Sequence, residues 1–189
     1  MEGNTMRKFW LIALPVAGLV SFGAPTQASC PDWLDEDINK LRSTEQVNFC
    51  DLHDGKPMLV VNTASFCGYT GQFEALETVY QAYRERGFTV VGVPSNDFRQ
   101  EADSQAKTAE ICFVDYGVTF TMTAPQSVKG VDAHPVFRTL AEKSGAEPGW
   151  NFNKYLIDAD ARQVWHYPSN VVPDDPELTA QIEALLQIE

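Results

Sequence analysis

The sequence predicts one α/β domain with a central mixed sheet flanked by helices. Continuous apolar stretches at residues 59–65 and 88–94 are typical of strands that are buried on both faces. A helical pattern at residues 70–86 lies between them, and this order joins parallel strands. An alternating stretch at residues 152–168, with a turn at "DADA", adds an antiparallel hairpin. A length of 189 residues with 44% hydrophobic content suits one domain.

The helices follow from local signals. In residues 70–86, apolar side chains recur three and four positions apart, and Gly87 follows as a typical helix stop. Residues 103–116 predict a second helix, and a loop continues from it through Pro125. Residues 134–144 predict a third helix.

The closing helix has the clearest start signal, with Asp175 as the expected N-cap and Pro176 at the first helical position. The resulting order is strand, helix, strand, helices, hairpin, helix. A mixed sheet in this order, covered by helices, is thioredoxin-like. In that arrangement the junction between the first strand and its helix is the reactive corner, and Cys67 occupies it.

The N-terminal 29 residues predict a secretory signal peptide. Arg7 and Lys8 precede an apolar run at residues 9–20, and small residues follow up to Ser29. An apolar run of this length is shorter than the roughly 20 residues that a spanning helix needs. We therefore expect export, to the periplasm, with cleavage near Ala28 and no stable membrane insertion afterwards. A membrane anchor at the N-terminus is the alternative.

The net charge and the spacing of histidines and cysteines make nucleic acid, metal ions and cofactors unsuitable partners. The net charge is −12 and no cluster of Lys and Arg is present, so nucleic acid is an unsuitable partner. The histidines His53, His134 and His166 are far apart, and no C-x-x-C spacing occurs, so we predict no metal site. Neither a phosphate loop nor a dinucleotide fingerprint is present, so we predict no cofactor.

Export changes what the four cysteines predict, because disulfides form and persist outside the cytosol. Cys30 and Cys50 flank a polar segment with little core to bury, and we predict that a bridge between them ties this extension to the domain. The chain then divides into a signal peptide (1–29), an extension (30–50) and a thioredoxin-like domain (51–189). Lipidation of Cys30 is the alternative, because "QASC" faintly resembles a lipobox.

Cys67 stands where a nucleophile is favoured. The N–H groups and dipole at a helix N-terminus stabilise a thiolate, and Gly68 lets the backbone turn closely. A buried structural cysteine is the alternative. A dithiol site would need a second cysteine three residues on, where Thr70 stands. We therefore expect Cys67 to attack a substrate and to be released by a distant partner.

Four blocks of the sequence resemble the glutathione peroxidase family, cysteine type. They are "VVNTASFCGYTGQFEALETVY", "VVGVPSNDFRQE", "TAEICFVDYGVTFTM" and "WNFNKYLID", and the resemblance covers residues 45–188. It implies a thioredoxin-like fold and the reduction of hydroperoxides. Each block alone is a weak signal, whereas the early cysteine block combined with the late "WNF" block is specific.

The resemblance assigns roles to three residues. Cys67 matches the peroxidatic position, and Trp150 and Asn151 match a tryptophan and an asparagine whose N–H groups hydrogen-bond the sulfur. Two neutral donors near a sulfur stabilise the thiolate and the oxygen that leaves a broken O–O bond. Without the resemblance, "WNF" predicts aromatic packing in the core.

Asp97 departs from the family's pattern, which has glutamine in an N-Q-F block where this chain has "NDF". A carboxylate beside a thiolate disfavours the anion unless the acid is protonated or turned away. Asp97 is therefore either a proton acceptor at the site or a cap of the following segment. Gln100 is close in sequence and is a second candidate donor.

Cys112 matches the resolving cysteine of thioredoxin-dependent members of the family. The implied cycle forms a sulfenic acid on Cys67, then a Cys67–Cys112 disulfide, which an external dithiol reduces. Because Cys112 falls in a predicted helix, this bond requires local unwinding. The alternative is that Cys112 is only a buried helix cysteine.

The implied partners are a hydroperoxide and a thioredoxin-like reductant. Direct use of glutathione is the alternative, although basic residues for this anionic thiol are absent from residues 65–80 and only Arg99 lies near Asp97. A thiol–disulfide oxidoreductase of the envelope and a redox sensor are two further alternatives.

Overall fold

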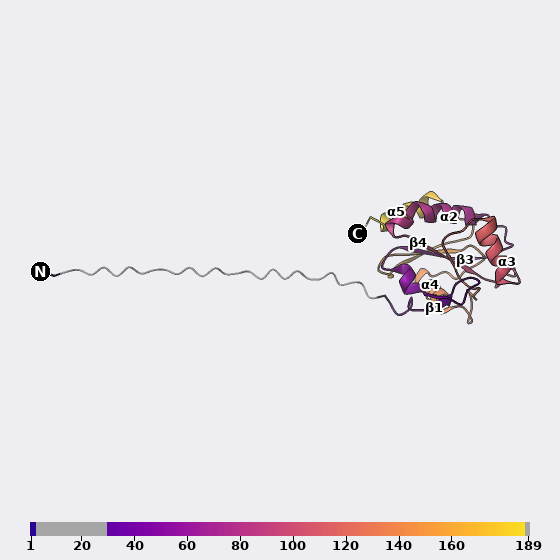
Figure 1. Cartoon of the computed structure of the whole chain (residues 1–189), viewed down its shortest axis with the longest axis horizontal. Coiled ribbons are helices and arrows are strands. Elements are labelled where there is room, and N and C mark those ends of the chain that lie inside the picture. The colour runs from indigo at the N-terminus through magenta and orange to yellow at the C-terminus, as the bar shows by residue number, and fades with distance from the viewer. Residues whose placement is uncertain (3–29, 188–189) are drawn as a thin grey trace.

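The computed structural model describes residues 30–187 and the first two residues of the chain (Figure 1). The predicted signal peptide and its cleavage site fall almost wholly outside this part and remain predictions. The strands are β1 (Asp37–Asn39), β2 (Gln46–Asn48), β3 (Met58–Thr63), β4 (Thr89–Pro94), β5 (Thr121–Met122), β6 (Lys154–Ile157) and β7 (Val164–Tyr167). The helices are α1 (Phe49–His53), α2 (Gln72–Tyr83), η1 (Arg84–Arg86), α3 (Gln105–Ala109), η2 (Glu110–Asp115), α4 (Pro135–Ser144) and α5 (Pro176–Leu185).

The main sheet is mixed, as the sequence predicts. Its strand order is β5-β4-β3-β6-β7. The pairs β3–β4 and β4–β5 are parallel, whereas β6 pairs antiparallel with both β3 and β7. Val60 lies opposite Val91 on one side and Tyr155 on the other, which puts β3 at the centre of the sheet. The α/β prediction is confirmed.

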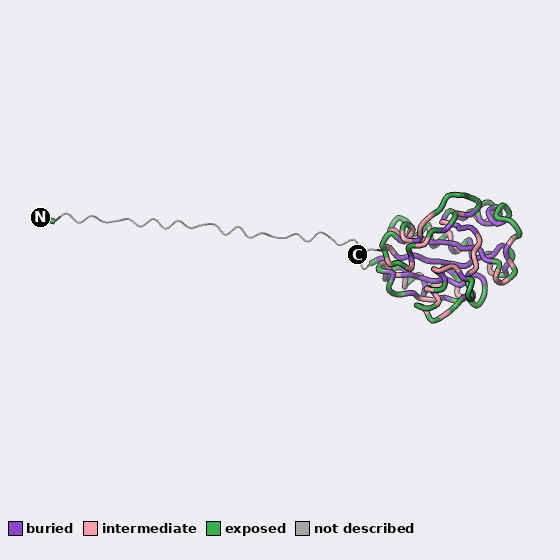
Figure 2. The backbone as a smooth tube through the Cα atoms, turned by 90° about the horizontal axis from the view of Figure 1, so that it is seen from below, coloured by how far each residue is buried: buried purple, intermediate pink, exposed green. Residues whose placement is uncertain are grey.

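Helices cover both faces of this sheet. Figure 1 shows α2 and α5 on one side of it, and α4 with the β1–β2 hairpin on the other. Successive residues of β3 point to opposite faces, so Leu59 and Val61 pack with α2 and α5, whereas Met58 and Val60 pack with α4. All six residues of β3 are buried, and Figure 2 shows the buried strands enclosed by exposed outer loops.

Two segments differ from the predicted elements. The predicted loop before Pro125 contains the short strand β5, which pairs with Gly92 of β4. A Cβ atom on Gly92 would lie only 2.3 Å from Met122 Sδ, so a larger residue there would force the Met122 side chain to move. The predicted helix at 103–116 is instead a short α-helix, α3, followed by the π-helical turn η2. Sequence periodicity does not distinguish the two helix types.

The helix ends agree with their predicted signals. Asp175 caps α5 by accepting a hydrogen bond from the Glu177 N–H at 2.8 Å, and Pro176 opens that helix. Gly87 follows η1 with a φ of 90°, a left-handed conformation that glycine adopts without strain. No helix within residues 30–187 combines the length and apolar character needed to cross a bilayer.

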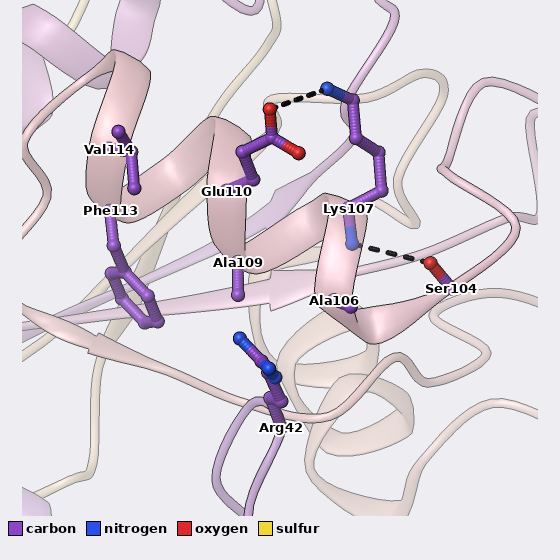
Figure 3. Close-up of a pocket in the computed structure, with 8 residues that line it drawn as sticks. All are labelled: Arg42, Ser104, Ala106, Lys107, Ala109, Glu110, Phe113 and Val114. Carbon is purple, nitrogen blue, oxygen red and sulfur yellow. Dashed lines mark hydrogen bonds and ion pairs between the residues drawn. The ribbon is translucent and has the colours of Figure 1, made fainter.

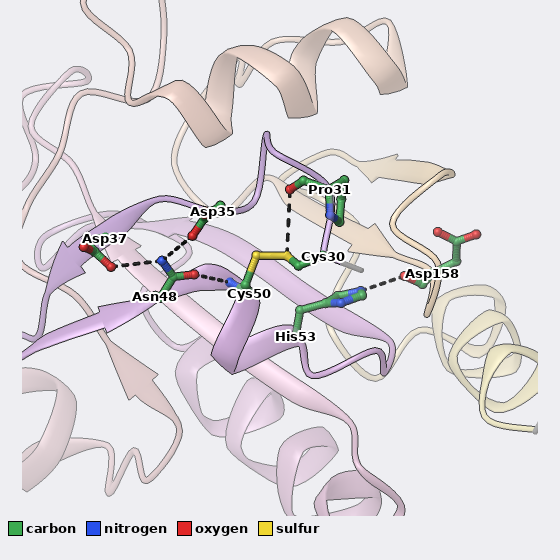
Figure 4. Close-up of a disulfide and its surroundings, with 8 residues drawn as sticks. All are labelled: Cys30, Pro31, Asp35, Asp37, Asn48, Cys50, His53 and Asp158. Atoms are coloured by element: carbon green, nitrogen blue, oxygen red, sulfur yellow. Dashed lines mark hydrogen bonds between the residues drawn. A yellow bond between two sulfur atoms is a disulfide. The ribbon is translucent and has the colours of Figure 1, made fainter. Parts of the chain in front are cut away.

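The predicted disulfide is present. Cys30 and Cys50 are bridged, with their Cα atoms 5.8 Å apart (Figure 4). The segment between them buries more than its polar sequence suggests, because Leu34, Ile38 and Phe49 are almost fully enclosed. The Leu41 N–H also donates to the Met122 carbonyl at 2.9 Å. The hairpin is thus joined to the edge strand β5 as well as to the bridge.

Candidate active site

Cys67 lies in the turn between β3 and α2. It is 8% exposed, and the Tyr69 N–H donates a hydrogen bond to its Sγ at 3.4 Å. The helix begins at Gln72, so this donor belongs to the turn and not to the helix that the sequence places directly after the cysteine.

Thr70 braces this turn at the position where a dithiol site would have its second cysteine. Its Oγ1 accepts from the Cys67 N–H at 3.0 Å and lies 2.8 Å from the Cys67 carbonyl and 3.0 Å from that of Ala64. The threonine hydroxyl therefore holds the turn closed around Cys67 from both sides. Residue 70 has a structural role here and supplies no redox partner.

Strand pairing brings Trp150 and Asn151 to the same corner. They lie shortly before β6, which runs antiparallel to β3, and the Phe152 N–H donates to the Asn62 carbonyl, so this segment lies beside the end of β3. The Asn62 side chain fixes this segment by donating to the Trp150 carbonyl at 3.0 Å and accepting from the Asn153 N–H at 3.0 Å. Phe152 has a φ of 62°, a left-handed kink between the two loop residues and the strand.

Asn151 and Gln100 form the clearest side-chain contact of the corner. Asn151 is fully buried, and its Nδ2 donates to Gln100 Oε1 at 2.9 Å. The Gln100 carbonyl in turn accepts from the N–H of Phe66, the residue before Cys67, at 2.9 Å. Trp150 is 41% exposed and packs against Phe98 in a tilted arrangement, with ring centroids 5.3 Å apart.

Asp97 is directed elsewhere. Its Oδ2 accepts from the N–H groups of Val128 at 2.7 Å and Lys129 at 3.2 Å, which makes it a cap of that loop. The structure therefore brings Gln100, and not the Asp97 carboxylate, into contact with Asn151. From the sequence, Gln100 was only the second candidate, because the family's N-Q-F block draws attention to residue 97.

Cys112 lies in η2, 1% exposed, and is a free thiol like Cys67. Both cysteines belong to the buried cluster between the sheet and α2. Burial, followed by the negative charge of Glu101, raises the pKa of Cys112 to about 12. In this resting fold Cys112 is therefore a protonated, poorly reactive thiol.

Glu101 is a buried acid that the sequence analysis did not single out. It is 8% exposed, and its Oε1 accepts from the Ala102 N–H at 2.8 Å, from Thr108 Oγ1 at 2.8 Å and from the Ser65 hydroxyl. The one signal in the sequence was its place directly after Gln100 in the "NDFRQE" block.

Two cavities adjoin the cysteine-bearing segments. One of about 410 Å³ lies next to the corner, lined by Tyr69, Trp150, Asn153 and Ser169, with no charged side chain in its wall. The other, of about 600 Å³, lies against α3 and η2 and is drawn in Figure 3. There Arg42 from the N-terminal hairpin points toward Ala109 and Phe113. Phe113 and Val114, which also line the cavity, are exposed apolar residues that follow Cys112.

Comparisons with known proteins agree with this geometry. The glutathione peroxidase family profile matches residues 35–141. The glutathione peroxidase of Lactococcus lactis subsp. cremoris is 41% identical over 147 residues, which cover 75% of this chain and 92% of that protein. The hydroperoxy fatty acid reductase of Synechocystis sp. is 41% identical over 144 residues, covering 70% of this chain and 84% of the relative.

A solved structure supports the same conclusion. The crystal structure of T. cruzi GPX1 is 26% identical, covers 82% of this chain and 96% of its own, and superposes with a TM-score of 0.63. The thioredoxin-like fold is thereby confirmed. The chain belongs to the glutathione peroxidase family and is a thiol-dependent peroxidase, which reduces hydroperoxides with electrons from thiols.

Proposed function

We propose that Cys67 reduces the hydroperoxide, that Cys112 resolves the product, and that a thioredoxin-like dithiol restores the enzyme. One observation carries this proposal. The two free cysteines are packed in one buried cluster, whereas Cys30 and Cys50 are already bridged on the opposite face of the sheet. Cys67 and Cys112 are thus the pair available for a redox cycle.

In the first step the Cys67 thiolate attacks the terminal oxygen of the hydroperoxide. An S–O bond forms, the O–O bond breaks, and the leaving oxygen takes a proton and departs as alcohol or water. The Tyr69 N–H supports the sulfur anion. Because Asn151 holds Gln100 Oε1, the NH₂ group of Gln100 is left to donate to the reacting oxygen, together with the indole N–H of Trp150.

In the second step the Cys112 sulfur attacks Cys67. The S–S bond forms, the S–O bond of the sulfenic acid breaks, and the hydroxyl leaves with the thiol proton as water. Disulfide formation requires Cα atoms about 5.5 Å apart, so the π-helical turn around Cys112 must rearrange. Capture of the sulfenic acid protects Cys67 from further oxidation.

The surroundings of the corner favour a protein dithiol over glutathione. Glutathione is anionic, and cations in the wall would help to hold it. The cavity that Tyr69 and Trp150 line, in the segments next to Cys67 and Asn151, has aromatic and neutral polar groups in its wall. A thioredoxin-like protein needs no such pocket, because it reduces its target disulfide by thiol exchange between two protein surfaces.

A single oxidation experiment tests the assignment. One equivalent of hydrogen peroxide is added to protein whose Cys67 and Cys112 are reduced, and non-reducing peptide mapping follows. We expect a Cys67–Cys112 linked peptide, with the Cys30–Cys50 peptide present before and after. Turnover assays with thioredoxin and with glutathione then identify the better reductant. Absence of the linked peptide would contradict the role of Cys112.

We also propose that the protein works outside the cytosol. The charged, apolar and small-residue order of residues 1–29 supports export, and the Cys30–Cys50 bridge suits an oxidising compartment. N-terminal sequencing of the mature protein and cell fractionation test this. A cytosolic protein that retains its first 29 residues would contradict it.

A further inference from the structure

Glu101 has an arrangement that the proposed cycle does not explain. Its Oε1 accepts three hydrogen bonds, whereas its Oε2 is buried and has no partner among residues 30–187. A buried carboxylate oxygen without a partner is costly, and such groups in native folds call for an explanation. The remaining contacts of Glu101 indicate what it does.

One carboxylate oxygen joins the two cysteine-bearing segments. Ser65, which donates to Oε1, lies two residues before Cys67. Thr108, which donates to the same oxygen at 2.8 Å, lies four residues before Cys112, about one helical turn. Glu101 therefore holds α3, the helix that leads into η2 and Cys112, against the turn that carries Cys67.

The negative charge of Glu101 and its hydrogen bonds both stabilise the resting state of Cys112. Resolution needs a thiolate on Cys112, and both burial and the nearby carboxylate disfavour that anion. Resolution also needs η2 to rearrange, and the Thr108 bond opposes this. Both effects stabilise the state in which Cys112 is protonated and folded away.

A second carboxylate bounds the same segment at its far end. Glu77 of α2 accepts from the Thr119 N–H at 2.8 Å and from the Thr119 hydroxyl at 2.6 Å. The segment between Thr108 and Thr119 therefore lies between two anchors, with Cys112 inside it. Glu101 differs from Glu77 in being buried and in contacting the Cys67 corner as well.

We propose that Glu101 is a positioning residue of the resolving step, a latch that holds Cys112 in its resting place and sets the rate at which the Cys67–Cys112 disulfide forms. This inference rests on the proposed role of Cys112. When the latch opens, the attack proceeds with the balance given above, and water is the only product released. If Glu101 releases Cys112 slowly, the sulfenic acid on Cys67 persists for longer.

Two variants separate the charge from the hydrogen bond. Glu101→Gln removes the charge and keeps an acceptor oxygen, and Thr108→Val removes the helix bond and keeps the charge. Thr78→Val is the matched control, because Thr78 Oγ1 also donates to the carbonyl four residues earlier, on an exposed helix face. Circular dichroism and thermal unfolding establish that each variant is folded.

The readout is a single turnover. Reduced protein is mixed with one equivalent of hydrogen peroxide, quenched at intervals with an alkylating reagent, and analysed for the Cys67–Cys112 bond. We expect Glu101→Gln to accelerate bond formation about threefold to tenfold, since one pKa unit of the thiol is a factor of ten in thiolate. Thr108→Val should accelerate it about threefold, and Thr78→Val should leave it unchanged.

A second measurement isolates Cys112. In a Cys67→Ser background, Glu101→Gln should raise the alkylation rate of Cys112 by a similar factor, which a purely structural role of Glu101 at the corner would not do. Folded variants that form the disulfide at the parent rate or more slowly would overturn the latch. If the parent itself forms no Cys67–Cys112 bond, the resolving role fails, and the latch fails with it.

Discussion

Asn151 Nδ2 donates a hydrogen bond to Gln100 Oε1 at 2.9 Å, across 51 residues of sequence. Because the Gln100 carbonyl also accepts from the Phe66 N–H, this one glutamine connects the loop before β6 to the turn that carries Cys67. The bond orients the amide of Gln100, and for this reason we propose Gln100 as a donor to the reacting oxygen.

The first prediction compares Gln100 with Asp97. Gln100→Ala should lower kcat/KM for hydroperoxide on the order of a hundredfold, as expected for the loss of one oriented donor. Asp97→Asn should change it less than about threefold and cost about 1 kcal/mol of stability, because Asp97 only caps the loop at Val128. Steady-state kinetics and denaturant unfolding measure both. An equal loss in the two variants would return the role to Asp97.

The second prediction concerns the nucleophile. Cys67→Ser should abolish peroxide reduction, because a serine hydroxyl cannot form the sulfenic acid of the proposed cycle. The fold should persist, since the turn is braced by Thr70 and not by the sulfur. Peroxide consumption and circular dichroism test this. Substantial residual activity would show that the reacting sulfur lies elsewhere.

The third prediction concerns Cys112. Cys112→Ser should lose turnover with thioredoxin and should accumulate sulfinic acid on Cys67 as peroxide is raised, because nothing captures the sulfenic acid. Mass spectrometry of the Cys67 peptide detects the added oxygens. Normal turnover of this variant with thioredoxin would make Cys112 a packing residue and would favour the glutathione-type cycle.

The fourth prediction concerns the N-terminal bridge. Replacing Cys30 and Cys50 together by alanine should lower the free energy of unfolding by roughly 3 kcal/mol, the chain-entropy value for a loop of about 20 residues. The peroxidase rate of the folded fraction should be unchanged, since the bridge lies on the face of the sheet opposite Cys67. A large loss of activity in fully folded protein would contradict this separation.

The fifth prediction concerns pH and Lys154. This lysine is fully buried and donates to Gln72 Oε1 at 2.8 Å, and burial lowers its pKa from 10.5 to about 7. Above pH 7 the unfolded chain therefore binds a proton that the folded chain does not, so this group makes stability rise with pH. Below pH 7 both states are protonated and the contribution is constant.

Lys154→Met isolates that contribution. Between about pH 7 and 9, the parent should gain up to about 2 kcal/mol of unfolding free energy relative to the variant. The three histidines titrate below this window, because burial lowers each of their pKa values from 6.5. Denaturant titrations at several pH values measure the difference. Parallel pH profiles for parent and variant would show that Lys154 stays charged.

Local signals in the sequence predicted much of the fold. The apolar stretches became β3 and β4, and the stop at Gly87 and the cap at Asp175 stand where helices end or begin. Each of these features is determined by residues that are adjacent in the sequence, so the sequence pattern alone can reveal it. The strand β5 was missed because a strand of two residues is too short to show a hydrophobic pattern. Its position depends on pairing with Gly92 in β4, which is distant in the sequence.

The site was predictable where it depends on position and not where it depends on side-chain direction. Cys67 was identified because it lies at the junction between a buried strand and a helix. Asp97 and Gln100 lie three residues apart, and only the fold shows that one meets Val128 and the other Asn151. Glu101 is an acid in a polar stretch, and nothing local reveals that it is buried against Thr108.

The central sheet also acts as a partition between two kinds of sulfur. The bridged Cys50 packs on the α4 face, whereas the free thiols Cys67 and Cys112 share the α2 face. Thiol–disulfide exchange needs direct contact between sulfur atoms, and a buried strand layer prevents it. The Cys30–Cys50 crosslink can therefore stay oxidised during the redox cycle that we propose for Cys67 and Cys112.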